Sequence, residues 1–320
     1  MNLSIICVNW NSVDYLRECI ASIYENTSNL SWEILVVDNA SPQGGVETLK
    51  DQFPEVKIIK SSKNLGFAGA NNIGFQQSAG EYVLFLNPDT KLISPTVNIL
   101  FDNIRKLPDA GIVGCKMLNT DLSVQITSIQ KLPTILNQIL NSEHLHLLWP
   151  SCPIWNIGPL FREQTQPTKV EVIPGACMML RRSVFEEAGM FSEDYFMYGE
   201  DLDLNFKLKQ AGYTNYYIGE AVIVHYGGRS SSQQKLNQWA TVMKYRAMTR
   251  YFQKTHGRFY EARYRTAMGC VALSRLILLA LMHPFGTVLW DKQSLRRASG
   301  KWKVVLKWAI GFRNFALEDR

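Results

Sequence analysis

Four short apolar runs in the first 90 residues constrain the fold more than any other feature of this sequence. Each run has the length of a buried strand, and a helical or glycine-rich segment separates it from the next. Strands that alternate with helices predict βαβ units, which build an α/β fold with a mainly parallel central sheet and helices on both faces. The predicted strands are Leu3–Val8, Glu33–Val37, Val56–Lys60 and Tyr82–Leu86, with helices after Asn11, over Gln43–Gln52 and up to Ala79.

Each of these strands runs into a cluster of polar residues or glycines. One such cluster is typical of an ordinary turn, since Asn, Asp, Gly and Pro favour turns. Four clusters behind four consecutive strands favour a ligand site, because open α/β sheets bind ligands outside the carboxyl ends of their strands. The clusters are Asn9–Asn11, Asp38–Ser41, Asn64–Asn72 and Asn87–Asp89.

The middle of the chain is less regular. Residues 119–170 mix Pro, Asn, Gln and aromatic residues, which predicts long loops and short helices of a kind that often binds ligands. Regular patterns return after this stretch, although Pro174-Gly175-Ala176 interrupts the first of them. The later predicted strands are Gly111–Cys115, Val170–Leu180 and Val222–Val224, and the later helices are Arg182–Ala188, Glu200–Gly212 and Leu236–Phe252.

Charge divides the chain near residue 228. Residues 1–228 carry 16 Lys and Arg against 24 Asp and Glu, a net charge of −8, whereas residues 229–320 carry 18 against 4, a net charge of +14. A basic tail is expected to bind an anionic surface, either lipid headgroups or nucleic acid. The acidic body and the absence of recognition-helix, zinc-finger and RNA-binding motifs argue against nucleic acid as a partner.

The basic tail contains an apolar segment, Ala267–Trp290, which Arg275 interrupts. Its stretch without Lys, Arg, Asp or Glu, Leu276–Trp290, has 15 residues, whereas a membrane-spanning helix needs about 20. We expect the segment to lie in or against lipid headgroups, with a buried helix pair of a soluble domain as the alternative. The first ten residues carry no basic signal region and the six cysteines form no CxxC pair, which predicts a cytoplasmic protein. Membrane association through the basic tail would place this protein on the inner face of the cell membrane.

Several common catalytic motifs are missing. The sequence has no GxxxxGK[ST], GxGxxG, GxSxG or HExxH pattern, so P-loop, dinucleotide-binding, serine-hydrolase and zincin chemistries have no support. Instead, Asp89 ends one predicted strand and His225 follows the last, and both are ligands suited to Mg²⁺ or Mn²⁺. Asp201 is a candidate general base for an acceptor hydroxyl, although acids in the first turn of a helix also suit the helix dipole.

Seven segments in a fixed order resemble family 2 glycosyltransferases, in particular the bacterial rhamnosyltransferase-like branch of polysaccharide assembly. The resemblance spans residues 2–230 and implies a GT-A fold. Asn87-Pro-Asp89 stands where the wider family has Asp-x-Asp, which leaves Asp89 as the one carboxylate for a metal. The segments are VNWNS (8–12), VVDNAS (36–41), NLGFAGANNIG (64–74), FLNPDT (85–90), PGACMMLRR (174–182), YGEDLDLNFKLKQAGY (198–213) and VHYGGRS (224–230).

The resemblance implies a role for each matching residue. Trp10 would stack on the nucleotide base, unless it is a core aromatic, and Asp201 would be the general base. Asp89 and His225 would hold Mg²⁺ or Mn²⁺ on the donor diphosphate. The other donor-site residues implied are Asn9, Asn11, Asp38, Asn64, Gly66, Asn72 and Asn87, and the acceptor-site residues are Gly175, Tyr198, Glu200 and Trp155.

The resemblance also implies the reaction, which is inverting transfer from a nucleotide-diphosphate sugar, with dTDP-L-rhamnose as the expected donor. A UDP-sugar donor and a non-catalytic sugar-nucleotide or glycan-binding module are the alternatives. The expected acceptor is a polyprenyl-diphosphate-linked saccharide or a growing polysaccharide. We expect a catalytic domain over 1–228, with a donor half over 1–110 and an acceptor half over 111–228, and a helical extension over 229–320. The apolar face of Leu236–Phe252 leaves a homo-oligomer open.

Overall fold

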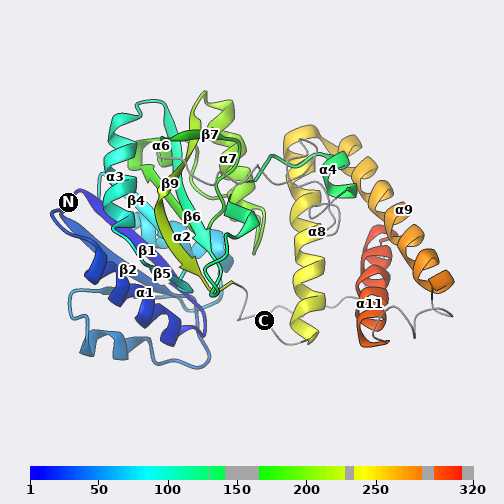
Figure 1. The fold of residues 1–320 in the computed structure, drawn as a ribbon, viewed down its shortest axis with the longest axis horizontal. Helices are drawn as coiled ribbons and strands as arrows, with labels where there is room; N and C mark the ends of the chain where they lie inside the picture. The colour runs from blue at the N-terminus through cyan, green and yellow to red at the C-terminus, as the bar shows by residue number, and fades with distance from the viewer. Residues whose placement is uncertain (129, 141–165, 228–233, 283–291, 312–320) are drawn as a thin grey trace. The chain divides into compact units, whose positions relative to one another are not determined.

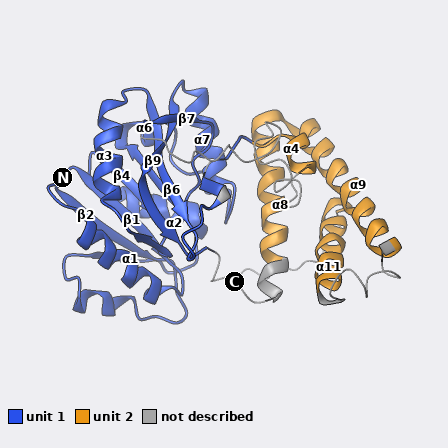
Figure 2. Ribbon diagram, viewed as in Figure 1, with its two compact units in different colours: residues 1–132, 143–230 blue, residues 133–142, 231–320 orange. Residues whose placement is uncertain are grey.

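The computed structural model describes residues 1–128, 130–140, 166–227, 234–282 and 292–311. The chain divides into two compact units, drawn in different colours in Figure 2. Residues 1–132 and 143–230 form unit 1, and residues 133–142 and 231–320 form unit 2. Unit 1 is the α/β part and unit 2 is helical (Figure 1).

The first half of unit 1 is a parallel sheet. Strands β1 (Leu3–Asn9), β2 (Trp32–Asp38), β3 (Lys57–Lys60) and β4 (Tyr82–Leu86) lie in the order β3-β2-β1-β4. They pair in parallel throughout, as the sequence predicted. Helices α1 (Val13–Asn26) and α2 (Gly66–Gln76) connect them. The predicted helix over 43–52 is wrong: a 3₁₀ helix, η1, covers only Val46–Asp51, because Gly44 and Gly45 both have positive φ, which no α-helical turn accepts.

The second half of the sheet is mixed. Its order continues from β4 as β8-β6-β9-β5, with β7 on β9, and only β6 and β9 pair in parallel. The predicted strand over 170–180 is two strands, and the predicted strand over 222–224 is the end of a longer one. The elements are β5 (Thr90–Leu92), α3 (Thr96–Lys106), β6 (Ala110–Leu118), η2 (Ile126–Ser128), β7 (Thr168–Val170), β8 (Cys177–Arg181), α6 (Arg182–Glu187), α7 (Glu200–Gln210) and β9 (Thr214–His225).

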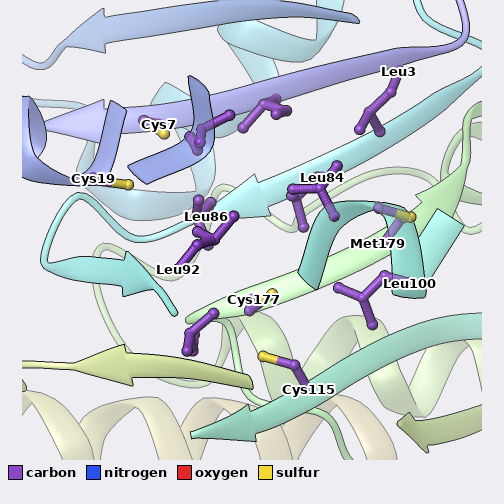
Figure 3. Packing of buried hydrophobic residues seen from close by; sticks show 14 of the residues in the cluster. Leu3, Cys7, Cys19, Leu84, Leu86, Leu92, Leu100, Cys115, Cys177 and Met179 are labelled. Carbon is purple, nitrogen blue, oxygen red and sulfur yellow. The ribbon is translucent and has the colours of Figure 1, made fainter. Parts of the chain in front are cut away.

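Burial on both faces explains why the strands have continuous apolar sequences. Leu3, Ile5 and Cys7 of β1 belong to one buried cluster, and Ile6 belongs to another. Successive side chains of a strand point to opposite faces, so the two clusters lie on opposite sides of the sheet. Figure 3 shows part of the first cluster, in which Cys7 and Cys19 lie near each other. The core therefore holds the strand ends, and the polar clusters behind them, in fixed positions.

Unit 2 consists of α4 (Ile135–Ile139), α8 (Gln234–His256), α9 (Arg258–Met282) and α11 (Lys292–Ala309). Gly257, at φ +86°, makes the turn between α8 and α9. Buried aromatic residues join these two helices, with the rings of Phe252 and Tyr264 4.9 Å apart. Arg265 Nη2 donates to the backbone oxygen atoms of Trp308 and Ala309, which joins α9 to α11.

The apolar part of α9 begins earlier in the chain than the apolar segment that the sequence indicated. Over Arg258–Leu281 it is long and apolar enough to cross a membrane by length and composition, with 17% of its most apolar window buried. The sequence analysis considered only the charge-free stretch from Leu276, part of which lies outside the described residues. Four apolar residues in the carboxyl-terminal half of α9 expose half or more of their surface, namely Leu273, Ile277, Leu278 and Leu281, and Phe259 in its first turn is also exposed.

Candidate active site

Strand register brings the first two polar clusters together. Asn9 and Asp38 end neighbouring parallel strands and face each other across β1 and β2. Asn9 Nδ2 donates to Asp38 Oδ1 at 2.7 Å and to Ser41 Oγ at 3.1 Å. Asn9 Oδ1 accepts from the backbone and hydroxyl of Ser12. Asn9 is fully buried, and its amide holds the loops after β1 and β2 together.

Trp10 and Asn11 follow β1 at the edge of the sheet. Asn11 has a φ of +53°, and its N–H donates to Ser41 Oγ at 3.0 Å. Its Oδ1 accepts from the Gln43 N–H at 3.1 Å. These two bonds hold the turn against the loop after β2, and Trp10 lies within it, partly exposed. Trp10 is therefore not a core aromatic.

The third cluster is bound to the second through Asn39, which the sequence analysis did not single out. Asn39 Nδ2 donates to Asn64 Oδ1 at 2.9 Å and to the Gly66 carbonyl oxygen at 3.1 Å. Its Oδ1 accepts from the Leu65 N–H at 2.8 Å. Gly66 has a φ of +71°, and a Cβ there would lie 2.0 Å from the Phe196 carbonyl oxygen. Glycine is required because backbone approaches so closely.

Helix α2 also holds the segment that precedes α7. Asn72 Nδ2 donates to the Phe191 carbonyl oxygen and to Glu193 Oε1, both at 2.9 Å. Asn72 Oδ1 accepts from the Phe191 N–H at 3.2 Å, and the Phe67 N–H donates to the Phe196 carbonyl oxygen at 3.0 Å. The Asn72 amide is thus engaged with residues 191–193.

The fourth cluster meets His225. Strands β5 and β9 pair with Thr90 opposite His225, which places His225 Nε2 3.4 Å from Asp89 Oδ1 and 3.5 Å from Asn87 Nδ2. On the other side of the ring, Gln125 Oε1 lies 3.1 Å from His225 Nδ1, and Gln125 Nε2 donates to the His225 carbonyl oxygen at 2.6 Å. An amide oxygen only accepts, so this network assigns the imidazole proton to Nδ1.

The Asp89–His225 pair fits a divalent cation. With its proton on Nδ1, His225 presents a lone pair at Nε2 to a carboxylate oxygen, and two acceptors at this distance favour a cation. One carboxylate and one imidazole suit Mn²⁺ or Mg²⁺. Within the described ranges, no group of three His, Cys, Asp or Glu side chains could hold a metal. Among the described residues, Asp89 and His225 would therefore hold the ion as a pair.

Asp201 lies at the start of α7, against the loop that precedes β8. Its Oδ2 accepts from the Gly175 N–H at 3.1 Å, and its Oδ1 accepts from the Leu202 N–H at 2.8 Å. Burial raises the pKa of Asp201, and the backbone bonds from Gly175 and Leu202 oppose this rise. A carboxylate with a raised pKa is a stronger proton acceptor.

Glu200, the residue before Asp201, is more deeply buried than Asp201. It is 5% exposed, and its Oε2 has no hydrogen-bond partner within the described part of the chain. Burial, together with the Asp201 charge, raises the pKa of Glu200 to about 8. Tyr198 and Gly199, at φ +68° and +88°, turn the chain into the helix. Asp203 faces elsewhere and accepts from Ser192 Oγ at 2.5 Å.

The turn that carries Asp89 and the helix start that carries Asp201 lie at the same edge of the sheet. Strands β4 and β8 pair with Leu86 opposite Cys177, and the Asn87 N–H donates to the Ala176 carbonyl oxygen at 3.0 Å. The Asn87–Asp89 turn therefore adjoins the loop whose Gly175 binds Asp201. The structure thus brings the predicted site residues Asn87, Asp89, Gly175 and Asp201 to one place. Trp155 lies outside the described residues. Gln125, which lies in the irregular stretch, carried no signal in the sequence.

Comparisons with known proteins identify the family of this chain. The model of glycosyl transferase family 2 matches residues 4–189, and that of glycosyl transferase family group 2 matches residues 155–313. An N-acetylglucosaminyl-diphospho-decaprenol L-rhamnosyltransferase of Mycobacterium tuberculosis is 28% identical over 251 residues, which cover 74% of this chain and 80% of the relative. Rhamnosyltransferase WbbL of Escherichia coli is 24% identical over 255 residues, which cover 77% of this chain and 92% of the relative.

Solved structures show the same fold. Mannosyltransferase PcManGT of Pyrobaculum calidifontis, in complex with GDP-Man and Mn²⁺, has a TM-score of 0.54 and 14% identity over 97% of this chain and 86% of its own. GalNAc-T7, with UDP, GalNAc and Mn²⁺, has a TM-score of 0.57 and 16% identity over 79% and 51%. The fold is of the GT-A type, and the chain belongs to glycosyltransferase family 2, as a glycosyltransferase that resembles the rhamnosyltransferases.

Proposed function

We propose that this glycosyltransferase transfers L-rhamnose from dTDP-L-rhamnose, with inversion, to a polyprenyl-diphosphate-linked saccharide or a growing polysaccharide. Two relatives are named as rhamnosyltransferases, and the name of one specifies a diphospho-decaprenol acceptor. The observation that carries the proposal is the β4–β8 register, because it brings the turn that carries Asp89 next to the loop that binds Asp201. The bond from Asn87 N–H to Ala176 O joins the turn that bears Asp89 to the loop that binds Asp201.

Asp201 is the proposed general base. It would accept the proton of the acceptor hydroxyl while that oxygen attacks the anomeric carbon and the bond to the diphosphate breaks. Its raised pKa favours this transfer, and the Gly175 and Leu202 N–H groups hold the carboxylate in one orientation. Inversion then needs no covalent intermediate on the enzyme.

Asp89 and His225 are the proposed ligands of Mg²⁺ or Mn²⁺, and Asn87 lies beside them. A divalent ion held there supplies positive charge for the departing diphosphate. Gln125 fixes the His225 ring through both a side-chain and a backbone contact. The partly exposed Trp10 is the proposed stacking partner of the base, and Asn9, Asp38, Asn64 and Asn72 shape the loops around it.

Single-turnover assays of Asp201→Asn test the reaction. The variant keeps the shape of the side chain but does not accept the proton, so transfer should fall by about 10²- to 10⁴-fold, while calorimetric affinity for dTDP-L-rhamnose with Mn²⁺ stays unchanged. Wild-type turnover in this variant would refute the base assignment. Transfer from UDP-sugars, with none from dTDP-L-rhamnose, would overturn the donor and leave the reaction class intact.

We also propose that unit 2 binds the surface of an anionic membrane without crossing it. Four exposed apolar residues of α9 (Leu273, Ile277, Leu278 and Leu281) lie in its carboxyl-terminal half. Arg275, in the same stretch, lies with its guanidinium 5.7 Å from the Trp302 ring of α11, so the helix is packed against another. Apolar residues among cationic ones suit shallow insertion between headgroups.

Sedimentation with liposomes tests the surface. The wild type should sediment with vesicles that contain phosphatidylglycerol and not with pure phosphatidylcholine vesicles. The double variant Ile277→Ser/Leu281→Ser should lose binding. Leu122→Ser, which changes an apolar residue of unit 1 that is 63% exposed, is the matched control and should bind normally. Equal sedimentation of the double variant and the control would refute the proposed surface.

A further inference from the structure

Asn205 lies fully buried on α7, one helical turn after Asp201. Its Nδ2 donates to the Ile173 carbonyl oxygen at 2.9 Å, and its Oδ1 accepts from the Ile173 N–H at 2.9 Å. One amide thus holds both backbone groups of a single residue. The same Nδ2 also donates to the Asp201 carbonyl oxygen at 2.7 Å.

A second amide supports the first. Asn215, on β9, donates from Nδ2 to Asn205 Oδ1 at 2.8 Å and to the Glu171 carbonyl oxygen at 3.1 Å. Its own Oδ1 accepts from the Ile112 N–H at 3.0 Å. Both donors and both lone pairs of the Asn205 amide are therefore used, which leaves that side chain one orientation.

The bonded residues alternate along the chain. Glu171 is bound by Asn215, Ile173 by Asn205 and Gly175 by Asp201. Sequence periodicity predicted a strand here, and backbone spacing of two residues is that of an extended chain. Three side chains bind Glu171, Ile173 and Gly175, whereas the Val172 carbonyl oxygen between them accepts from the Gln130 N–H at 3.3 Å. Pro174, whose φ is fixed by its ring, stands between the residue that Asn205 holds and the residue that binds Asp201.

From this geometry we infer that Asn205 is a positioning residue of the transfer reaction, which holds the Gly175 N–H against the Asp201 carboxylate. The inference rests on the proposed role of Asp201 as the base. Asn205 touches neither substrate nor the reacting proton. Through Ile173 and Pro174 it fixes the position of the donor N–H, and through the Asp201 carbonyl it fixes the helix turn that presents the carboxylate.

Removal of the hydrogen bonds from Asn205 should cause a specific kinetic change. The Gly175 bond stabilises the charged form of Asp201, so a displaced N–H raises the pKa of the base. A base works when deprotonated, so the acidic limb of the kcat/KM profile should move to higher pH. The expected shift is about one pH unit, since a hydrogen bond to a charged group is worth about as much as one unit of pKa.

Asn205→Ser is the main variant. A serine hydroxyl in a helix bonds the carbonyl four residues earlier, so it replaces the bond to Asp201 and is too short to reach Ile173. We expect a wild-type circular dichroism spectrum, an unchanged KM for dTDP-L-rhamnose, a lower kcat at pH 6.5 and the upward shift of the acidic limb. Asn205→Ala, which removes every bond, should show the same shift, with a lower Tm.

Leu100→Ala is the stability control. Leu100 is a buried core residue of α3, so this variant lowers Tm and should leave the pH profile unmoved. A folded Asn205→Ser enzyme with the wild-type acidic limb overturns the inference. Full activity of Asp201→Asn, measured in parallel, overturns the proposed function instead, so the two failures are distinguishable. Equal shifts in Asn205→Ser and Leu100→Ala would also overturn the inference, because general loosening would then explain both.

Discussion

The Asp89 carboxylate faces the imidazole of His225, with Oδ1 and Nε2 3.4 Å apart, although 136 positions separate the two residues in the sequence. The pairing of β5 with β9 creates this relationship, and a backbone bond from the Tyr226 N–H to the Asp89 carbonyl oxygen fixes it. The proposed cation site therefore depends on the correct pairing of two strands.

Asp89→Ala should abolish the dependence of dTDP affinity on Mn²⁺. Removal of the only carboxylate from the pair should weaken binding with Mn²⁺ by more than about tenfold, since even outer-shell changes cost this much at metal sites. Titration calorimetry with and without Mn²⁺ measures it. Glu220→Ala removes an exposed acid of β9 and should leave affinity unchanged. A wild type that binds dTDP equally with and without Mn²⁺ would contradict the proposed ligand pair.

Gln125→Leu should weaken the same metal-dependent binding without removing a ligand. The substitution deletes the acceptor at His225 Nδ1 and the donor to the His225 carbonyl, so the ring loses its fixed tautomer. We expect a loss of about tenfold in apparent Mn²⁺ affinity, the lower range for outer-shell partners. Gln125→Glu keeps an acceptor oxygen at Nδ1 and should retain more affinity than Gln125→Leu. The opposite ranking would argue against this role of Gln125.

Glu200→Gln should stabilise the protein progressively as pH rises from the ordinary pKa of a glutamate to about 8. The pKa of Glu200 is raised to about 8 in the folded protein, so its contribution to stability is complete below the ordinary pKa of a glutamate and is lost as pH rises through 8. Glutamine resembles the protonated acid and avoids this loss. The Tm difference between variant and wild type should be near zero at pH 5 and exceed about 2 °C at pH 9. Glu220→Gln, an exposed control, should show no such trend, and a pH-independent difference for Glu200→Gln would contradict the assignment.

Gly66→Ala should disrupt the contact between α2 and the segment before α7. The new Cβ would lie 2.0 Å from the Phe196 carbonyl oxygen, on a residue with positive φ. Gly44→Ala is a matched control, because Gly44 also has positive φ but has open space around its Cβ position. We expect Gly66→Ala to lose about 1–3 kcal/mol more stability than Gly44→Ala in urea unfolding, together with a fall in kcat. Equal losses would mean that only backbone strain matters.

Local patterns sufficed for the parallel half of unit 1. The apolar strands and the polar clusters behind them follow from residue type alone, because β1, β2 and β4 are buried on both faces. The second half was harder to predict. Residues 171–176 have the pattern of a strand, yet the backbone groups of Glu171 and Ile173 are bound by the side chains of Asn215 and Asn205, from elsewhere in the chain.

Most residues that hold the site in place bind residues far away in the sequence, so local patterns did not predict them. Asn72 binds Phe191 and Glu193 across about 120 positions, and Gln125 reaches His225 across 100. Neither contact has a local signature. The resemblance supplied the residues aligned to family motifs, such as Asp201, whereas Asn39, Gln125 and Asn205 became visible only from their hydrogen bonds.

The strand-end asparagines suggest how donor preference should be engineered in this enzyme. Asn9, Asn39, Asn64 and Asn72 direct their amides at neighbouring loops, so replacing them would damage the framework before it altered sugar choice. A library aimed at a new donor should keep these four residues. It should instead randomise Trp10, the proposed stacking partner of the base, whose side chain is partly exposed.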